Sequence, residues 1–578
     1  MTLSLKEISI ALLMPVTLFS GSANADPALY LKPTYYDGGH KNIAFFAAFG
    51  GSSHSIWVLD ICNELGRRGH NVLDREERKD DADEQTRFGK HYAHVKTVSV
   101  GPMNFHPSSI GDSSKLREEN PTTFITRAFE MFHLNFERDY TFTRNYFIDH
   151  EIDTAICDHF ADSCVEAATS LNIPYIITSS MEITKDSDTP YTHNNIMHLV
   201  EPTTEFESLY TRFYQEFILP AEFMRVLYPF LKKLNERKAA IGIDAKMIDQ
   251  STKWQNALKL VNNIHGFNTP RPMGPLVEQV GPIMPKHYNP LTESLKAYLD
   301  AHERIAYVAF GQMATPCKTD IKLILTSLLE SIERGFLDGF IWATVHAREL
   351  FPETITTSSG NIYHTESMSN GTDPNARLVS WAPQTAILMH PSTHLFVSHG
   401  GLGSWYESMY AGKRMIMFPF FGDQPSNSHI IEQSGLGAIL KYDDSYEKAL
   451  DVFKRVALDE DGEISGNVKR TQALAQIRSE HSVMRGVDAV EEVAYTHKNG
   501  ILPHRTSANR RMSFIKANNI DIYAILVVLL SATVGSIVYI AVKLWSFLSS
   551  VDAQIKKRKD LFGDDALSFE MTCSYGQD

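Results

Sequence analysis

A glycine-rich turn between residues 399 and 404 is the most chemically informative stretch of the sequence. It follows an apolar run, His394-Leu-Phe-Val-Ser398, that predicts a strand, and it precedes a predicted helix that ends at Gly412. Backbone N–H groups in such a turn can approach phosphate oxygens because glycine has no side chain, and the helix N-terminus adds a partial positive charge. The side chains of His399 and Ser404 can donate further hydrogen bonds. The pattern predicts a site that binds phosphate.

Residues on both sides of this turn could bind the remaining parts of a nucleotide-sugar. Upstream, Trp381 offers an aromatic face and Gln384 an amide that could read the edge of a base. Downstream, Asp423 and Gln424 form a carboxylate–amide pair suited to sugar hydroxyls. Groups for a base, a phosphate and a sugar in one short stretch are what a nucleotide-sugar site requires.

This stretch resembles the donor signature of the UDP-glycosyltransferase family. The likeness rests on W-x-P-Q at 381–384, on H-x-G-x-x-S-x-x-E at 399–407, and on A-G-K-R-M-I-M-F-P-F-F-G-D-Q-P-S-N from Ala411. The resemblance implies a donor site with Trp381 and Gln384 at the base, His399 and the amides around Gly401, Gly403 and Ser404 at the diphosphate, Glu407 at the ribose, and Asp423 and Gln424 at the sugar. If the sugar is glucuronate, its carboxylate needs a cation, for which Arg414 is one candidate.

The resemblance also implies a catalytic base, His54 in a loop after a predicted strand over 43–47, with Asp158 at the end of a predicted strand over 154–157 as its partner. A histidine can remove a hydroxyl proton near neutral pH, and a carboxylate on the other ring nitrogen fixes its tautomer. The carboxyl edge of an α/β sheet is where ligands bind. We expect inverting transfer of a hexose or hexuronate from a UDP-sugar, with no metal or other cofactor.

Strand-like and helix-like runs alternate through the body of the chain, which predicts parallel βα units. Further strands are expected over 305–310, 340–345, 377–380 and 394–398. Six prolines between Pro270 and Pro290 suit an extended connector between two halves. The predicted fold class is α/β, with two Rossmann-like domains facing across a cleft (GT-B type) and a C-terminal transmembrane helix.

The two ends of the chain predict secretion and membrane anchoring. Residues 1–25 have the basic start, short apolar core and Ala-x-Ala ending of a signal peptide, and Ile522–Val542 is an uncharged run long enough to span a bilayer. The basic cluster at 556–559 places the tail in the cytosol. We expect a single-pass type I protein of the endoplasmic reticulum or another secretory-pathway membrane. The predicted segments are a signal peptide (1–25), an acceptor domain (26–275), a UDP-sugar domain (276–500), a juxtamembrane segment (501–519), a transmembrane helix (520–545) and a cytosolic tail (546–578).

Two further features concern the lumenal body. Asn370 begins an Asn-Gly-Thr sequon and is predicted to be glycosylated. Cys157 and Cys164 could form a disulfide, but the sequence leaves that open. His70 and His159 are interpreted as structural.

Composition narrows the partners and leaves alternatives. A net charge of −14 disfavours nucleic acid, and five cysteines in 578 residues exclude a disulfide scaffold. Aromatic-rich stretches over 124–147 and 206–230 suggest a small lipophilic acceptor, such as a sterol, lipid or xenobiotic, and a homo-oligomer is compatible with the sequence. One alternative is a metal-dependent enzyme that uses the D-x-D patterns at 81–83 and 186–188. Another is a non-catalytic or regulatory lumenal protein that binds UDP-sugar.

Overall fold

A computed structural model describes residues 33–47, 52–78, 88–102, 113–182, 184–187, 189, 191–192, 207–244, 253–267, 269–345 and 347–562. The predicted signal peptide and residues 563–578 of the predicted cytosolic tail lie outside these residues. Residues 33–40, in which Tyr35–Gly38 make one turn of 3-10 helix, belong to a separate unit. Everything from Lys41 onward belongs to a second unit.

The first half of the body is built on a parallel sheet of seven strands in the order β3-β2-β1-β4-β5-β6-β7. The strands are β1 (Asn42–Phe46), β2 (Asn71–Arg78), β3 (Lys96–Pro102), β4 (Thr154–Asp158), β5 (Tyr175–Ser179), β6 (Leu258–Val261) and β7 (Val277–Gln279). Strand order reverses between β1 and β4, where Phe46 lies beside Cys157. Such a switch point opens a crevice at the carboxyl ends of the strands.

The second half repeats this plan with six parallel strands in the order β12-β9-β8-β13-β14-β15. They are β8 (Ile305–Ala309), β9 (Gly339–Ala343), β12 (Ala376–Val379), β13 (Thr393–Ser398), β14 (Arg414–Met417) and β15 (Gly437–Ile439), and a small antiparallel pair, β10 (Thr354–Thr356) and β11 (Ile362–His364), lies apart. The switch point falls between β8 and β13, so the turn at 399–404 emerges at its crevice.

Helices cover both faces of each sheet, because strands buried on both sides need apolar cover on both. On the first sheet α1 (Ser52–Arg67) and α17 (Ser482–Thr496) pack on one face, and α3 (Pro121–Phe132), α4 (Phe136–Asp149), α5 (Asp162–Ser170) and α7 (Leu219–Ala240) on the other. On the second sheet α10 (Lys318–Glu333) and α15 (Tyr446–Leu458) face α9 (Glu293–Asp300), α12 (Gln384–Met389), α13 (Leu402–Ala411), α14 (Gln424–Gln433) and α16 (Glu463–Glu480) across the strands. The shorter helices are α2 (Ser113–Leu116), α6 (Leu209–Phe213), α11 (Thr365–Asn370) and α18 (Phe514–Ala517).

The predicted α/β architecture of two Rossmann-like domains is confirmed, and each of the six quoted strands agrees with an observed strand to within two residues. Two elements lie across the predicted boundary at 275/276. Strand β7 completes the first sheet, and α17 returns to pack on α1. The return is held by Glu491, which accepts one hydrogen bond from Arg68 (2.6 Å) and contacts the Nε2 atom of buried His70 (3.1 Å). This contact agrees with the structural role predicted for His70.

Arg117 connects the two domains at the start of α10. Its guanidinium makes two hydrogen bonds of 2.9 Å to the carboxylate of Asp320. It also lies over the rings of Phe418 and Phe420, with 4.7 and 4.3 Å to the ring centroids. Both charged groups are buried. The cost of removing them from water is offset by the two hydrogen bonds and by the contact of the guanidinium with aromatic faces.

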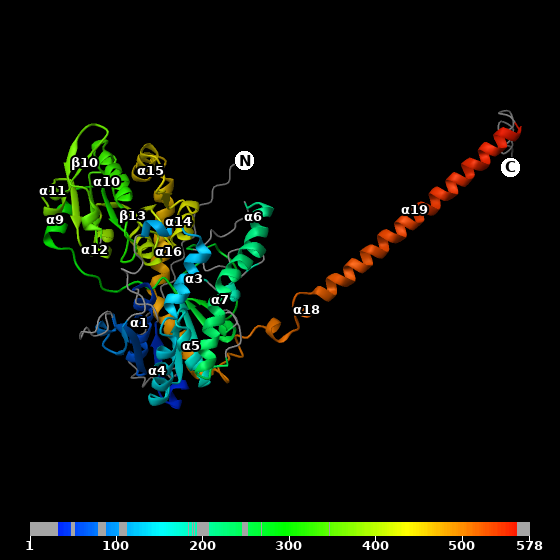
Figure 1. Cartoon of the computed structure of the whole chain (residues 1–578), viewed down its shortest axis with the longest axis horizontal. Helices are drawn as coiled ribbons and strands as arrows, with labels where there is room; N and C mark the ends of the chain where they lie inside the picture. The colour runs from blue at the N-terminus through cyan, green and yellow to red at the C-terminus, as the bar shows by residue number, and fades with distance from the viewer. Residues whose placement is uncertain are drawn as a thin grey trace, which may run out of the picture. The chain divides into compact units, whose positions relative to one another are not determined.

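The chain continues into one long helix, α19 (Ile520–Phe562), drawn in orange to red (Figure 1). Over Ile520–Leu561 it is long and apolar enough to cross a membrane. The observed helix extends beyond the predicted span of 520–545 and includes the basic cluster at 556–559. Before it, Arg510 pairs with Asp186 of the first domain.

Candidate functional site

A cavity of about 1540 Å³ is lined by residues of both domains. Ten of the predicted site residues line it: His54, Trp381, Gln384, His399, Gly401, Gly403, Ser404, Glu407, Asp423 and Gln424. The cavity lies at both switch points: the first contributes residues of the first turn of α1, and the second contributes the turn after β13. Asp158 lies behind His54, and Asn370 stands elsewhere on the surface.

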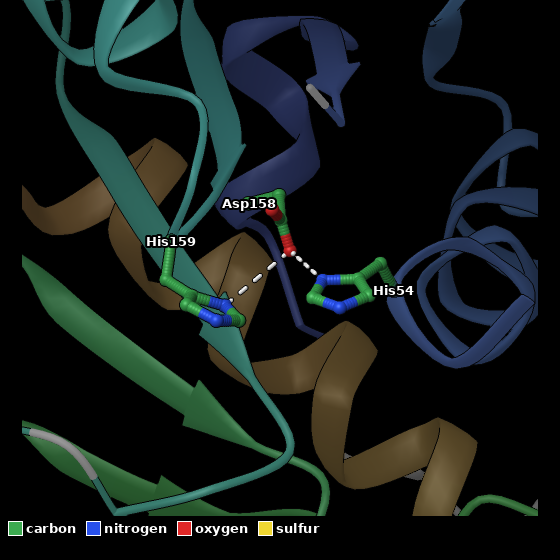
Figure 2. Close-up of side chains that lie close together, drawn as sticks. All are labelled: His54, Asp158 and His159. Atoms are coloured by element: carbon green, nitrogen blue, oxygen red, sulfur yellow. Dashed lines mark hydrogen bonds and ion pairs between the residues drawn. The ribbon is translucent and has the colours of Figure 1, made fainter. Parts of the chain in front are cut away.

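His54 and Asp158 meet in the structure although 104 residues separate them. The Nδ1 atom of His54 is 2.8 Å from the Oδ2 atom of Asp158, and the other carboxylate oxygen accepts the backbone N–H of Phe160 at 3.1 Å. Figure 2 shows the carboxylate of Asp158 directed at the His54 ring. The predicted loop around His54 is partly wrong, because α1 already begins at Ser52 and His54 lies in its first turn.

The electrostatics of the pair favour a charged carboxylate beside a basic imidazole. Burial lowers the pKa of His54, but the charge and hydrogen bond of Asp158, with a smaller contribution from Asp423, outweigh burial and raise it. Burial raises the pKa of Asp158, yet His54 and His159 bring it well below its usual range. The Nδ1 proton therefore points at the carboxylate, and Nε2 is the basic atom.

A third residue of this cluster, His159, was expected to be only structural. It lines the cavity, and its Nδ1 atom is 3.4 Å from the same oxygen of Asp158 (Figure 2). Side chains of successive strand residues point to opposite faces, so alternation would send His159 away from Asp158. However, β4 ends at Asp158 and the chain turns there. A histidine directly after a strand-end aspartate is the signal that could have found it.

A disulfide joins Cys157 to Cys164, with the two Cα atoms 5.8 Å apart. It ties the last-but-one residue of β4 to α5, and the closed loop contains Asp158 and His159. The bridge that the sequence left open is thus formed, and it braces the turn that carries the carboxylate.

His399 lies beneath the glycine-rich turn that follows β13. A Cβ atom on Gly401 would come within 2.5 Å of its Nε2 atom, and one on Gly311 within 2.9 Å. Glycine is therefore required at these two positions for close packing around the ring. Burial lowers the pKa of His399 to about 4, so near neutral pH it is an uncharged imidazole. It can offer a hydrogen bond to a phosphate, and the positive potential must come from the N-terminus of α13.

The end of the motif that is predicted to bind base and ribose is held in place by its own hydrogen bonds. The Nε2 atom of Gln384 donates to Ser404 Oγ at 3.2 Å and to Glu407, and Thr385 donates to Glu407 at 2.5 Å. Burial raises the pKa of Glu407, while the two hydrogen bonds act in the opposite direction. Trp381 stands beside this cluster with 60% of its surface exposed.

The end of the motif that is predicted to bind the sugar lies at the start of α14, where Asp423 occupies the N-cap position. Asn427 donates to the Oδ2 atom of Asp423 at 2.8 Å. The Oε1 atom of Gln424 accepts the backbone N–H groups of Phe420 (2.9 Å) and Phe421 (3.2 Å). The carbonyl of this amide is thus bound internally, and its NH₂ group is the part left to bind a sugar hydroxyl.

The structure gives Arg414 a different role from the one considered for it. Its guanidinium donates to the backbone oxygens of Val456 (2.9 Å) and Ala457 (2.7 Å) at the end of α15. It lies 3.9 Å from Asp459 and is absent from the cavity lining among the described residues. Arg414 caps a helix C-terminus, so it is not a partner for a sugar carboxylate.

Two groups could be considered for a metal ion. The ligand atoms of His54, Asp158 and His159 lie within 4.8 Å of one another. However, the Nδ1 atom of His159 is 3.1 Å from the carbonyl oxygen of Thr178, and only a protonated Nδ1 can make that hydrogen bond. Of the D-x-D patterns, 81–83 lies outside the described residues, and Asp186 is paired with Lys259 and Arg510. The Nδ1 atom of His159 and the carboxylate of Asp186 thus already have protein partners.

Asn370, the predicted glycosylation site, is the exposed last residue of α11. Its Oδ1 atom accepts the hydroxyl of Thr372 at 2.7 Å, so the asparagine and threonine of the sequon are in contact.

Three comparisons with known proteins agree with this geometry. A family model described as "UDP-glucoronosyl and UDP-glucosyl transferase" matches residues 167–559. The chain is similar to a UDP-glycosyltransferase (stmC) of Aspergillus ustus, with 26% identity over 83% of this chain and 93% of that one. It is also similar to the human UDP-glucuronosyltransferase 1A1, with 27% identity over 44% of this chain and 43% of the relative.

Solved structures share the fold at low identity. The glycosyltransferase of kitacinnamycin aligns with a TM-score of 0.55 and 16% identity over 78% of this chain and 99% of that one. A UDP-glucose:anthocyanidin 3-O-glucosyltransferase in complex with UDP aligns with a TM-score of 0.52 and 18% identity, over 78% of this chain and 99% of that one. Both alignments support the two-domain GT-B fold. Since the family model matches more than half of the chain, the protein belongs to this family of UDP-sugar-dependent glycosyltransferases.

Proposed function

We propose that the protein transfers a hexose or hexuronate from a UDP-sugar to a hydroxyl of a small lipophilic acceptor, with inversion and without a metal ion. The observation that carries the proposal is the His54–Asp158 pair, 2.8 Å apart, in a cavity that the donor motif also lines. His54 is the base, and Asp158 orients it.

In the proposed step the acceptor oxygen attacks the anomeric carbon while the Nε2 atom of His54 takes its proton. The carbon–oxygen bond to UDP breaks as the new glycosidic bond forms, so the configuration inverts. The leaving diphosphate gains negative charge, which backbone N–H groups around Gly401 to Ser404, the N-terminus of α13 and His399 can stabilise. Base assistance of this kind contributes about 10²–10⁴-fold to the rate.

Two observations support a reaction that needs no metal. The Nδ1 proton of His54 is shared with Asp158, which leaves Nε2 as a base. In the second D-x-D pattern the described aspartate, Asp186, forms ion pairs with Lys259 and Arg510. Activity should survive EDTA. Loss of activity in EDTA, restored by Mn²⁺ or Mg²⁺, would contradict this part of the proposal.

The lipophilic acceptor is supported by the first-domain wall of the cavity. An apolar part of that wall comes from α3 and from the ends of β4 and β5. Its apolar side chains include Phe124, Ile125, Met131, Phe132, Phe160 and Met181. Such surface binds a small apolar molecule by burial of its area.

We also propose a type I arrangement with the catalytic body in the lumen of the endoplasmic reticulum or another secretory compartment. Support comes from the apolar helix α19, from the Cys157–Cys164 disulfide, which needs an oxidising compartment, and from the exposed sequon at Asn370. An Asn370→Gln variant should lose the mobility shift that an endoglycosidase causes in the wild type.

The central test is His54→Ala, assayed by UDP release and product formation with a panel of UDP-sugars and lipophilic acceptors. Transfer should fall by about 10²-fold or more, while UDP binding by calorimetry stays near the wild-type value. His265→Ala, at an exposed histidine outside the cavity lining, is the matched control. Near-normal transfer by His54→Ala would show that the base is misassigned.

A further inference from the structure

His159 contacts the same carboxylate oxygen of Asp158 that His54 contacts. Its Nδ1 atom is 3.4 Å from Asp158 Oδ2, the oxygen that also contacts His54 Nδ1 at 2.8 Å. Its ring lies against the His54 ring, with centroids 5.2 Å apart and planes inclined by 26°. Figure 2 shows the two imidazoles on either side of one carboxylate.

The hydrogen bonds of His159 define where its proton is. The Nδ1 atom lies 3.1 Å from the carbonyl oxygen of Thr178 on β5, and a carbonyl can only accept, so Nδ1 carries hydrogen. That N–H is directed between the Thr178 carbonyl and the Asp158 carboxylate. The Nε2 atom of His159 is buried and has no hydrogen-bond partner among the described residues.

We propose that His159 is a positioning residue for the base, acting through Asp158 and through the face of the His54 ring. Its N–H draws electron density from the shared carboxylate oxygen, and its ring limits the rotation of His54. The proposal rests on the proposed role of His54, which it deepens.

The charged and titratable groups around His54 and Asp158 determine whether loss of the His159 N–H raises or lowers the pKa of His54. His54 faces Asp158 at the end of β4, His159 beside it, and Asp423 at the start of α14. The titratable groups that shift the pKa of Asp158 are His54 and His159. Without the His159 N–H, the carboxylate is more basic and holds the His54 proton more tightly. Removal of that N–H should therefore raise the pKa of His54.

Two variants separate the N–H from the ring. His159→Phe keeps the ring and removes the N–H, while His159→Asn keeps an N–H donor near the Nδ1 position and removes the ring. In His159→Phe, kcat should fall by about 10-fold, KM for the UDP-sugar should stay within about twofold, and the acidic limb of the kcat profile should move up by about half a pH unit. In His159→Asn the limb should return to the wild-type position.

The matched control is His150→Phe. His150 also has its Nδ1 atom near a backbone oxygen, that of Tyr146 at 3.0 Å, and stacks on that tyrosine ring, but it lies outside the cavity lining. Its kcat and pH profile should equal those of the wild type. A wild-type kcat and limb in His159→Phe, or a limb shifted equally in His159→Asn, would overturn the proposal.

A measurement that needs no enzymatic turnover tests this proposal separately from the proposed function. Diethyl pyrocarbonate modifies only neutral imidazole, so the pH dependence of His54 modification in the full-length protein, followed by mass spectrometry of its peptide, reports the pKa of His54. A higher pKa in His159→Phe supports the positioning role even if His54 is not the base. An unchanged or lower pKa contradicts it. If the wild type transfers no sugar from any UDP-sugar in the panel, that result would instead contradict the proposed function.

Discussion

The imidazole of His54 is subject to opposing influences that set its chemistry. Burial disfavours its charged form, whereas the Asp158 carboxylate 2.8 Å away favours it, and the net effect raises its pKa. The carboxylate is itself buried and stays ionised because two histidines surround it. A base with a raised pKa is a stronger proton acceptor, but it is available only above that pKa.

This predicts the pH dependence of transfer. Only neutral His54 can accept a proton, so kcat/KM should fall as the pH drops through a pKa above about 6.5. Asp158→Asn removes the charge that raises this pKa, so the acidic limb should move to lower pH while the plateau rate falls by about 10²-fold or more. Profiles of both proteins between about pH 5 and pH 9 check this. A limb that stays in place or moves up in Asp158→Asn would contradict the assigned pairing.

A second prediction concerns Trp381. Because 60% of its surface is exposed, Trp381→Ala should leave the melting temperature almost unchanged. Stacking of a base on an aromatic ring contributes about 1–3 kcal/mol, so the Kd for UDP should rise by about 5- to 150-fold. Calorimetry with UDP measures the change, and Trp381→Phe should keep most of the affinity. Equal Kd values for wild type and Trp381→Ala would remove Trp381 from the base site.

The His54–Asp158 pair depends on the turn from β4 into α5. This turn carries Asp158 and His159, and the Cys157–Cys164 disulfide closes it. Strand β4 is fully buried, which fixes the position of Asp158 relative to β1 and hence to α1. The disulfide restricts the turn in the unfolded chain as well as in the folded one.

Reduction should therefore destabilise the protein. A bridge between residues 7 positions apart contributes about 2–3 kcal/mol by the loop-entropy argument. We expect Cys157→Ala/Cys164→Ala to melt at a lower temperature than the wild type and to be insensitive to reductant, which should lower only the wild-type midpoint. Scanning calorimetry with and without reductant tests this. If reductant lowers both midpoints equally, the bridge is not the source of the effect.

At the scale of the whole molecule, the site exists only while two domains stay together. Arg117 from the first domain and Asp320 from the second form a buried pair surrounded by Phe418 and Phe420. Removing one member of a buried ion pair leaves an uncompensated charge, whereas replacing both can be nearly neutral.

Arg117→Ala should thus destabilise the protein by about 3–5 kcal/mol. Arg117→Met/Asp320→Asn should recover most of that loss, since asparagine can still accept the backbone N–H of Cys317 as Asp320 does at 3.0 Å. Thermal unfolding of the single and double variants measures both effects. An equal loss in the double variant would show that the charge pair itself is not the cause.

The sequence by itself determined the donor motif, the six quoted strands to within two residues and the apolar C-terminal helix, because each of these is encoded by neighbouring residues. Only the tertiary structure decided which distant groups meet. His54 and Asp158 approach because strand order places β1 beside β4, and His159 joins them because the strand ends there. The return of α17 to the first domain and the use of Arg414 as a helix cap depend equally on packing between segments far apart in the chain. Local periodicity contains no information about such contacts, since they are set by the order of strands and the shape of the surfaces they bury.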